Sequence, residues 1–155
     1  MNKKKTTKKV HLLHCFFWIY VAVLIYLLLL SEREEYTYYR YNLVMFQEIK
    51  RFLNGSRYFS NMDILLNLLG NVVGFVPLGF MLPMIHKRKI YSLVSVFFVF
   101  MFSFMMEVIQ LTFRIGVFDV DDLFLNTLGG FIGFLCYFLG QRILNLRRRK
   151  KSHEK

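Results

Sequence analysis

Four long apolar segments alternate with shorter polar segments along the 155-residue chain. The apolar segments cover about residues 10–30, 64–85, 91–112 and 123–140. An α-helix rises about 1.5 Å per residue, so roughly 20 apolar residues cross a hydrocarbon core about 30 Å thick. The pattern therefore predicts an all-α, polytopic membrane protein with four transmembrane helices, in which residues 1–155 form a single membrane domain.

Lysine and arginine gather in three polar segments: the N-terminus, the short turn at 86–89 and a basic tail at 142–155. Short loops rich in these residues stay on the cytoplasmic side of a membrane. Because the number of spans is even, all three segments fall on one side, and both termini are predicted to be cytoplasmic. The loops at 31–63 and 112–122 then face outward. No small-residue cleavage site follows the first apolar segment, so we expect an uncleaved span.

A formal net charge of +11 would suggest a nucleic-acid partner in a soluble protein. Here the basic residues flank membrane-length apolar segments, so topology and contact with anionic lipids explain them, and no nucleic-acid partner is expected. The two cysteines, Cys15 and Cys136, lie in apolar segments and predict small hydrophobic side chains. The spacing of Asp119, Asp121 and Asp122 matches no calcium loop, so neither a metal nor a cofactor is expected.

Glycine and proline mark the second predicted span. Gly70 and Gly74 form a G-x-x-x-G pair, which is typical of closely packed membrane helices. Pro77 predicts a kink in the same helix, because proline lacks the backbone N–H that an internal helical position uses. In the preceding loop, residues 46–53 are compatible with a short interfacial helix and equally with a mobile loop.

Under the predicted orientation, three spans carry polar side chains close to the outer surface. At about 1.5 Å per residue, Asn67 and Asn71 of the second span lie about 6 and 12 Å deep. Glu107 and Gln110 of the third span lie about 7 and 3 Å deep, and Asn126 of the fourth about 6 Å. Polar groups that face lipid are costly, so we expect these side chains to face one another.

Arg114, Asp119 and Asp122 lie beside this polar layer, in and next to the 112–122 loop. The guanidinium of Arg114 could pair with Glu107, Asp119 or Asp122, and the sequence does not select among them. The layer is either a polar network that locks the helices together or an outward-facing pocket for the polar group of an amphiphile. Ionisable groups at membrane depth usually mark functional sites, which favours the pocket. Glu107 is the candidate general acid or base.

Polar and glycine residues also fall into four short motifs in a fixed order. The motifs are Asn42-Leu43-x-x-Phe46, Asn67-x-x-Gly70-Asn71-x-x-Gly74-Phe75-x-Pro77-Leu78-Gly79, Glu107-x-x-Gln110 and Asp119-x-x-Asp122-x-x-x-Asn126-Thr127-x-Gly129-Gly130-x-x-Gly133. Over residues 40–140 this order resembles the VanZ-like family of small bacterial membrane proteins. The resemblance implies a protein of the bacterial cytoplasmic membrane. With Arg114 added, the candidate binding residues are Asn67, Asn71, Glu107, Gln110, Arg114, Asp119, Asp122 and Asn126.

The resemblance further implies a part in low-level resistance to lipoglycopeptide antibiotics of the teicoplanin type. As a binding protein, the chain would hold a lipoglycopeptide or a lipid-linked cell-wall precursor among the membrane lipids, with the tyrosine-rich 31–63 loop covering the pocket. As an enzyme, it would use Glu107 with Asp119 or Asp122 on a lipid headgroup or drug. As a structural protein, it would use the polar layer only to stabilise the bundle.

Overall fold

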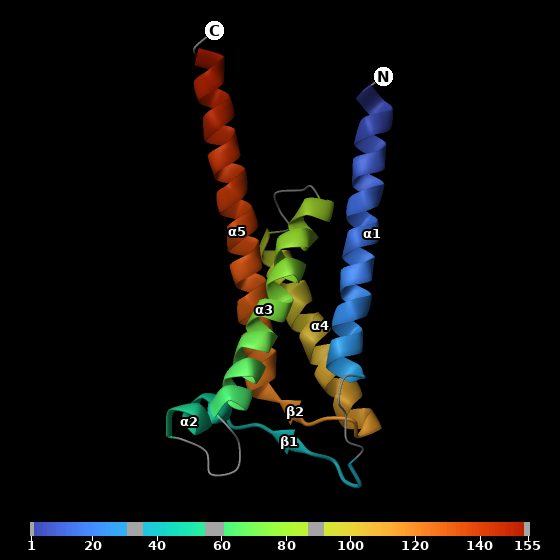
Figure 1. Cartoon of the computed structure of the whole chain (residues 1–155), viewed down its shortest axis with the longest axis vertical. Helices are drawn as coiled ribbons and strands as arrows, with labels where there is room; N and C mark the ends of the chain where they lie inside the picture. The colour runs from blue at the N-terminus through green and yellow to red at the C-terminus, as the bar shows by residue number, and fades with distance from the viewer. Residues whose placement is uncertain (1, 31–35, 55–60, 87–91, 154–155) are drawn as a thin grey trace.

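The computed structural model, drawn in Figure 1, describes residues 2–30, 36–54, 61–86 and 92–153. Within these residues four long helices dominate: α1 (Asn2–Leu29), α3 (Asn61–His86), α4 (Ser92–Phe113) and α5 (Val120–His153). Each contains a stretch that is long and apolar enough to cross a membrane: Val10–Leu29, Met62–Ile85, Val94–Phe113 and Val120–Ser152. The predicted all-α fold with four membrane-spanning helices is confirmed.

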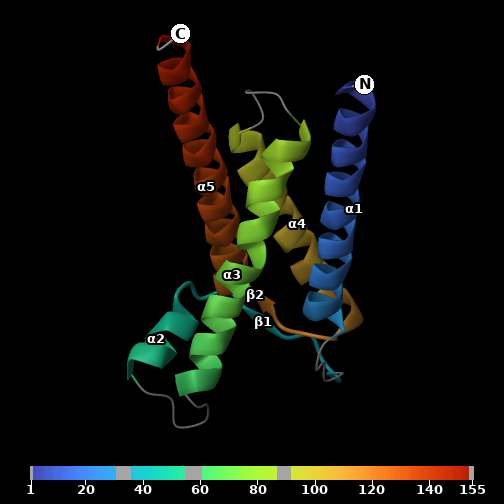
Figure 2. The same cartoon turned by 45° about the horizontal axis from the view of Figure 1, so that its top comes forward.

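The two ends of the helix bundle carry different elements. Both chain termini lie at one end, where α1 and α5 extend beyond α3 and α4 (Figure 1). The opposite end, which we call the loop end, carries the short helix α2 (Gln47–Asn54) and the strands β1 (Tyr41–Asn42) and β2 (Phe118–Asp119), as the tilted view in Figure 2 also shows. The sequence left a helix near 46–53 undecided; the structure forms it over Gln47–Asn54. The predicted cytoplasmic position of the termini stays a prediction.

The two strands tie the chain together at the loop end. Tyr41 pairs with Phe118 and Asn42 with Asp119 in parallel register. This pairing joins the segment before α2 to the connection between α4 and α5. The sequence analysis predicted neither strand, because two residues are too few to give an alternating pattern.

The most extensive helix contact lies between α3 and α5, and glycines of α5 make it possible. A Cβ atom added at Gly129 would lie 2.1 Å from the carbonyl oxygen of Val72, and one added at Gly133 would lie 1.9 Å from that of Val76. Real Cβ atoms essentially never approach another atom this closely. The two backbones are therefore in direct contact along this face, as small residues permit in membrane helices.

The predicted packing role of the Gly70 and Gly74 pair is wrong for Gly70. A Cβ atom at Gly70 would meet nothing within 4 Å, and one at Gly74 would lie 3.8 Å from a methyl carbon of Leu24, which is ordinary contact. Both glycines instead line a pocket. The G-x-x-x-G spacing could not tell close packing from open space, since both require the absence of a side chain.

Two further features concern helix continuity. Helix α3 runs without a break through Pro77, so the kink remains a prediction. Helix α5 continues to His153, so the predicted basic tail at 142–155 is helical through residue 153. Many large apolar side chains on the long helices are exposed, as lipid-facing residues would be.

Candidate functional site

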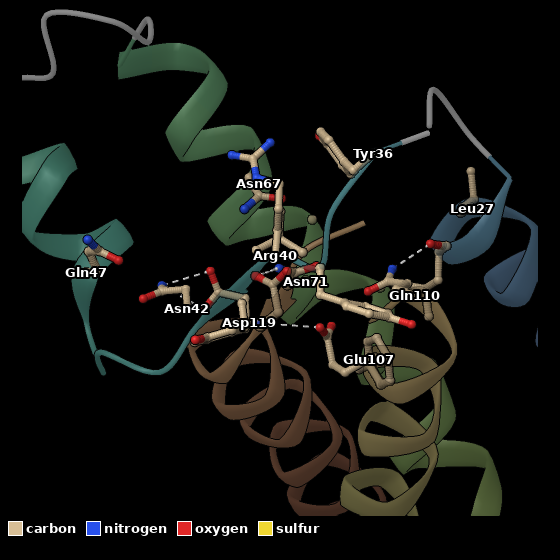
Figure 3. Close-up of a pocket in the computed structure, with 18 of the residues that line it drawn as sticks. Leu27, Tyr36, Arg40, Asn42, Gln47, Asn67, Asn71, Glu107, Gln110 and Asp119 are labelled. Carbon is tan, nitrogen blue, oxygen red and sulfur yellow. Dashed lines mark hydrogen bonds between the residues drawn. The ribbon is translucent and has the colours of Figure 1, made fainter. Parts of the chain in front are cut away.

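A pocket of about 1110 Å³ opens at the loop end, among α1, α3, α4 and the segment that leads into α2 (Figure 3). Ligand pockets in proteins commonly measure about 300–1,000 Å³, so this one has room for a drug-sized molecule or a lipid headgroup. Its lining combines carboxylates, amides, arginines, tyrosines and aliphatic side chains.

Two carboxylates form the interior of the pocket. Glu107 on α4 is only 3% exposed, and its Oε2 atom accepts the backbone N–H of Asp119 over 2.9 Å. Asp119, 9% exposed, accepts from the side-chain amide of Asn42 over 3.0 and 3.1 Å (Figure 3). Each carboxylate is thus held by donors of another segment, and the chain Glu107–Asp119–Asn42 links α4 to β2 and β1.

Asp119 also caps helix α5. Its Oδ1 atom accepts the N–H of Asp121 over 2.8 Å, two residues on, as an N-cap side chain does. Asp121 is 2% exposed, and its Oδ1 atom accepts the N–H of Phe46. Phe46 has a positive φ of 62°, which a side-chain-bearing residue adopts only with support from its surroundings. These acids therefore fix the turn that leads into α2.

Amide side chains complete the polar interior. Asn71 of α3 donates to Asp122 of α5, and Gln110 of α4 donates to the carbonyl oxygen of Leu28 over 2.8 Å. Asn67 lies one turn from Asn71 and lines the same pocket. Four helices therefore meet at the loop end through hydrogen bonds, in addition to apolar contact.

Arginine and tyrosine side chains surround the mouth. The guanidinium carbon of Arg40 lies 4.5 Å from the ring centroid of Tyr36, a cation–π arrangement. Arg40, Arg51, Tyr38, Tyr39 and Tyr41 are exposed and line the pocket. Sequence analysis missed the two arginines, although the tyrosine-rich composition of residues 31–63 had predicted a cover for the pocket.

One wall of the pocket is apolar. Leu24, Leu27 and Leu28 of α1 face it, together with Phe75 of α3. The same wall includes Gly70 and Gly74, which add no side chain to it. The pocket therefore presents hydrogen-bonding groups at one side and hydrocarbon at another, as an amphiphilic ligand requires.

The structure separates the eight predicted binding residues into two groups. Six of them line the pocket together: Asn67, Asn71, Glu107, Gln110, Asp119 and Asp122. Arg114 and Asn126 lie elsewhere. The amide of Asn126, 2% exposed, donates to the hydroxyl of Ser103 over 2.8 Å, between α5 and α4. Depth alone could not distinguish these positions, because it does not give the direction in which a side chain points.

Arg114 is turned away by the end of helix α4. The N–H of Ile115 bonds to the carbonyl of Gln110 over 3.1 Å, and that of Arg114 to Leu111 over 3.2 Å, while Arg114 has φ 58°. This is a Schellman cap with arginine at the position that glycine usually occupies. The Arg114 side chain lies over the ring of Tyr39, 4.5 Å from its centroid, and donates over 3.4 Å to the carbonyl of Thr37.

Comparison with known proteins places this architecture in a family. The sequence model of the VanZ/LLP1 family matches residues 17–143. This chain belongs to the VanZ/LLP1 family. Over 81 residues it is 35% identical to protein VanZ of Enterococcus faecium, an alignment that covers 52% of this chain and 50% of the relative. The chain thus spans about half the length of this curated relative, and no solved structure matches it.

Family membership and the four candidate spans together make the chain a multi-pass bacterial membrane protein of the VanZ type. Within the part of this VanZ-family chain that the structure describes, no three His, Cys, Asp or Glu side chains form a group that could hold a metal ion. Asp119, Asp121 and Asp122 instead accept hydrogen bonds from Asn42, Phe46 and Asn71. The acidic residues at the start of α5 therefore accept hydrogen bonds from donors of the protein itself.

Proposed function

We propose that this VanZ-family membrane protein contributes to resistance to lipoglycopeptides of the teicoplanin type by holding an amphiphile in the pocket at the loop end. The amphiphile is the drug itself or a lipid-linked cell-wall precursor. The observation that carries the proposal is the composition of the pocket, in which buried carboxylates and amides face an apolar wall on α1 and α3. Membership of the family that includes protein VanZ supports the link to resistance.

The proposal places the pocket in the outer leaflet. Both termini lie at the opposite end of the bundle, and the exposed Arg147–Lys151 run is part of the α5 extension there (Figure 1). Clusters of Lys and Arg remain cytoplasmic, so the loop end would face outward. Lipoglycopeptides and precursors carried to the outer surface would meet the pocket on that side, without crossing the membrane.

A membrane-embedded enzyme is the alternative, with Glu107 and Asp119 or Asp122 acting on a lipid headgroup or drug. Their common position in the pocket favours this possibility. Their hydrogen bonds favour binding instead. Glu107 accepts the N–H of Asp119, and the carboxylate of Asp119 accepts three hydrogen bonds from two donors, the Asn42 amide and the Asp121 N–H. These carboxylate oxygens are thus engaged by the protein's own donors, as groups that shape a fixed binding surface would be.

The test uses Glu107→Gln, which keeps the size of the side chain and an oxygen that can accept the Asp119 N–H, but which cannot ionise. The control is Asp63→Asn, which makes the same change at an exposed acid of α3 outside the pocket. We expect both variants to be present in the membrane at equal levels and to keep the minimum inhibitory concentration of teicoplanin within about twofold. A fall to the level of a deletion strain with Glu107→Gln alone would favour the enzyme.

A second pair of variants tests the pocket itself. Glu107→Ala and Asp122→Ala remove acceptors of the Asp119 N–H and the Asn71 amide, so we expect resistance to fall. If both variants fold and resistance persists, the pocket proposal is wrong. Mass analysis of teicoplanin and of membrane lipids, from cells with and without the protein, then separates the mechanisms. Binding leaves both chemically unchanged, whereas catalysis produces a new mass.

A further inference from the structure

We propose that the ligand of the pocket is an amphiphile that carries a phosphate group, with the phosphate on Arg40 at the mouth and the start of the hydrocarbon chain beside Gly70. This inference rests on the proposed function, because it names the ligand class of the same pocket. Two independent observations lead to it. One concerns unused hydrogen-bond donors, and the other concerns unfilled space beside α3.

The unused hydrogen-bond donors belong to the guanidinium of Arg40. Its guanidinium lies over the ring of Tyr36, and within the described part of the chain it makes no hydrogen bond or ion pair. By contrast, Glu107, Asp119 and Asp122 all accept hydrogen bonds from the protein. The pocket therefore offers an exposed cation with a full set of donors, and what that cation lacks is an anionic partner.

A phosphate suits Arg40 for two reasons. The planar guanidinium donates two parallel hydrogen bonds to phosphate oxygens, and stacking on Tyr36 holds the plane in place. In the interior, Glu107 and Asp119 are acceptors already bonded to the protein's own donors, whereas the guanidinium at the mouth is a donor suited to an anion. In a membrane the phosphate groups of lipids lie at the interface, next to which the loop end would be placed, with their chains directed toward the bilayer centre.

The space for a chain lies along α3. A Cβ atom at Gly70 would meet nothing within 4 Å, and Gly74, one turn further along, meets only a methyl carbon of Leu24 at 3.8 Å. Leu24, Leu27 and Phe75 border the same wall. The open space therefore lies beside Gly70 and ends at Gly74, where Leu24 is in contact and the hydroxyl of Tyr20 donates to the carbonyl oxygen. This open groove beside Gly70 would hold the part of the hydrocarbon chain nearest the phosphate.

The structure supplies matched pairs of variants. Arg40→Gln removes the proposed phosphate ligand, and Arg114→Gln removes an arginine that stacks on a tyrosine at the same 4.5 Å but does not line the pocket. Gly70→Leu fills the groove, and Gly140→Leu makes the same change on α5, where an added Cβ also meets nothing within 4 Å. Because Gly70 is unobstructed, we expect its leucine variant to fold.

Binding is measured by native mass spectrometry on the purified full chain in detergent. The probes are a long-chain polyprenyl phosphate, phosphatidylglycerol, inorganic phosphate and teicoplanin. We expect Arg40→Gln and Gly70→Leu each to weaken binding of the phosphate lipid by about tenfold or more, and Arg114→Gln and Gly140→Leu to change it less than about twofold. Preference between the polyprenyl phosphate and phosphatidylglycerol identifies the source of the phosphate.

Three results would overturn the inference. If inorganic phosphate competes as well as the lipids, the groove takes no chain. If teicoplanin binds and both phosphate lipids do not, the ligand class is wrong while the proposed function stands. If no probe binds and Gly70→Leu leaves resistance unchanged, the inference and the proposed function fall together. Thermal unfolding of Arg40→Gln alongside wild type checks that any loss of binding is not a loss of fold.

Discussion

The direct backbone contact between α3 and α5 predicts that alanine at Gly129 separates these helices. The added Cβ atom would lie 2.1 Å from the Val72 carbonyl oxygen, so the backbones must move apart by roughly 1 Å or more to reach van der Waals distance. Overpacking of this kind costs about 1–3 kcal/mol. Alanine also favours a helix over glycine by about 0.5–1 kcal/mol, which offsets part of that cost.

Gly140→Ala isolates the packing contribution. Gly140 lies on the same helix, and a Cβ atom there meets nothing within 4 Å. The helix-propensity gain is common to both variants, so the difference between their free energies of unfolding is the overpacking cost, about 1–3 kcal/mol. Unfolding in detergent micelles with added dodecyl sulfate, followed by circular dichroism, measures this difference.

The same variant has a consequence in the pocket. Val72 follows Asn71, whose amide donates to Asp122 of α5. If α3 moves away from α5, this hydrogen bond lengthens, and we expect ligand affinity to fall in Gly129→Ala but not in Gly140→Ala. Equal stability of the two variants would refute the close contact, and with it the view that α5 glycines, rather than Gly70, set the helix packing.

Three further predictions concern side-chain hydrogen bonds. Asn42→Leu removes the donor to Asp119, a loss of about 1–3 kcal/mol, so amide exchange in residues 36–46 should accelerate by about tenfold or more. Ser103→Ala leaves the buried amide of Asn126 without its acceptor and should lower unfolding free energy by about 1–2 kcal/mol in the dodecyl sulfate titration. Tyr20→Phe removes a hydroxyl that bonds to the α3 backbone, and the same titration should show a loss of about 0.5–1 kcal/mol.

The sequence predicted the helices and the polar layer because both follow from one-dimensional rules. Span length follows from apolar composition, and depth follows from the rise per residue. Spacing of three or four residues then placed Asn67 with Asn71, and Glu107 with Gln110, on common faces, and all four line the pocket. Polar side chains within a membrane are costly when they face lipid and therefore face one another, which is why the sequence predicted that these four lie together.

The features that the sequence did not predict depend on the path of the chain outside the helices and on the orientation of side chains. Arg114 follows α4 directly, yet a left-handed cap turns its side chain toward Tyr39. Arg40 is distant in sequence from the six predicted residues that line the pocket, and the pairing of β1 with β2 brings it to the mouth. Asn126 does not line the pocket, and its amide donates to Ser103. Caps, two-residue strands and side-chain direction leave no periodic signal.

The observed positions assign a structural role to the acidic residues at the start of α5. Charged groups near the bilayer are costly, and such groups usually mark functional sites, which is why the sequence favoured a pocket here. Asp119, Asp121 and Asp122 lie at the N-terminus of α5, where the helix dipole favours negative charge, and each accepts a donor from another segment. Their cost is offset by capping, by the dipole and by the loops they hold. In the proposed phosphate site, recognition would then fall to groups whose hydrogen-bonding capacity the fold does not use, and among the described residues that line the pocket Arg40 is such a group.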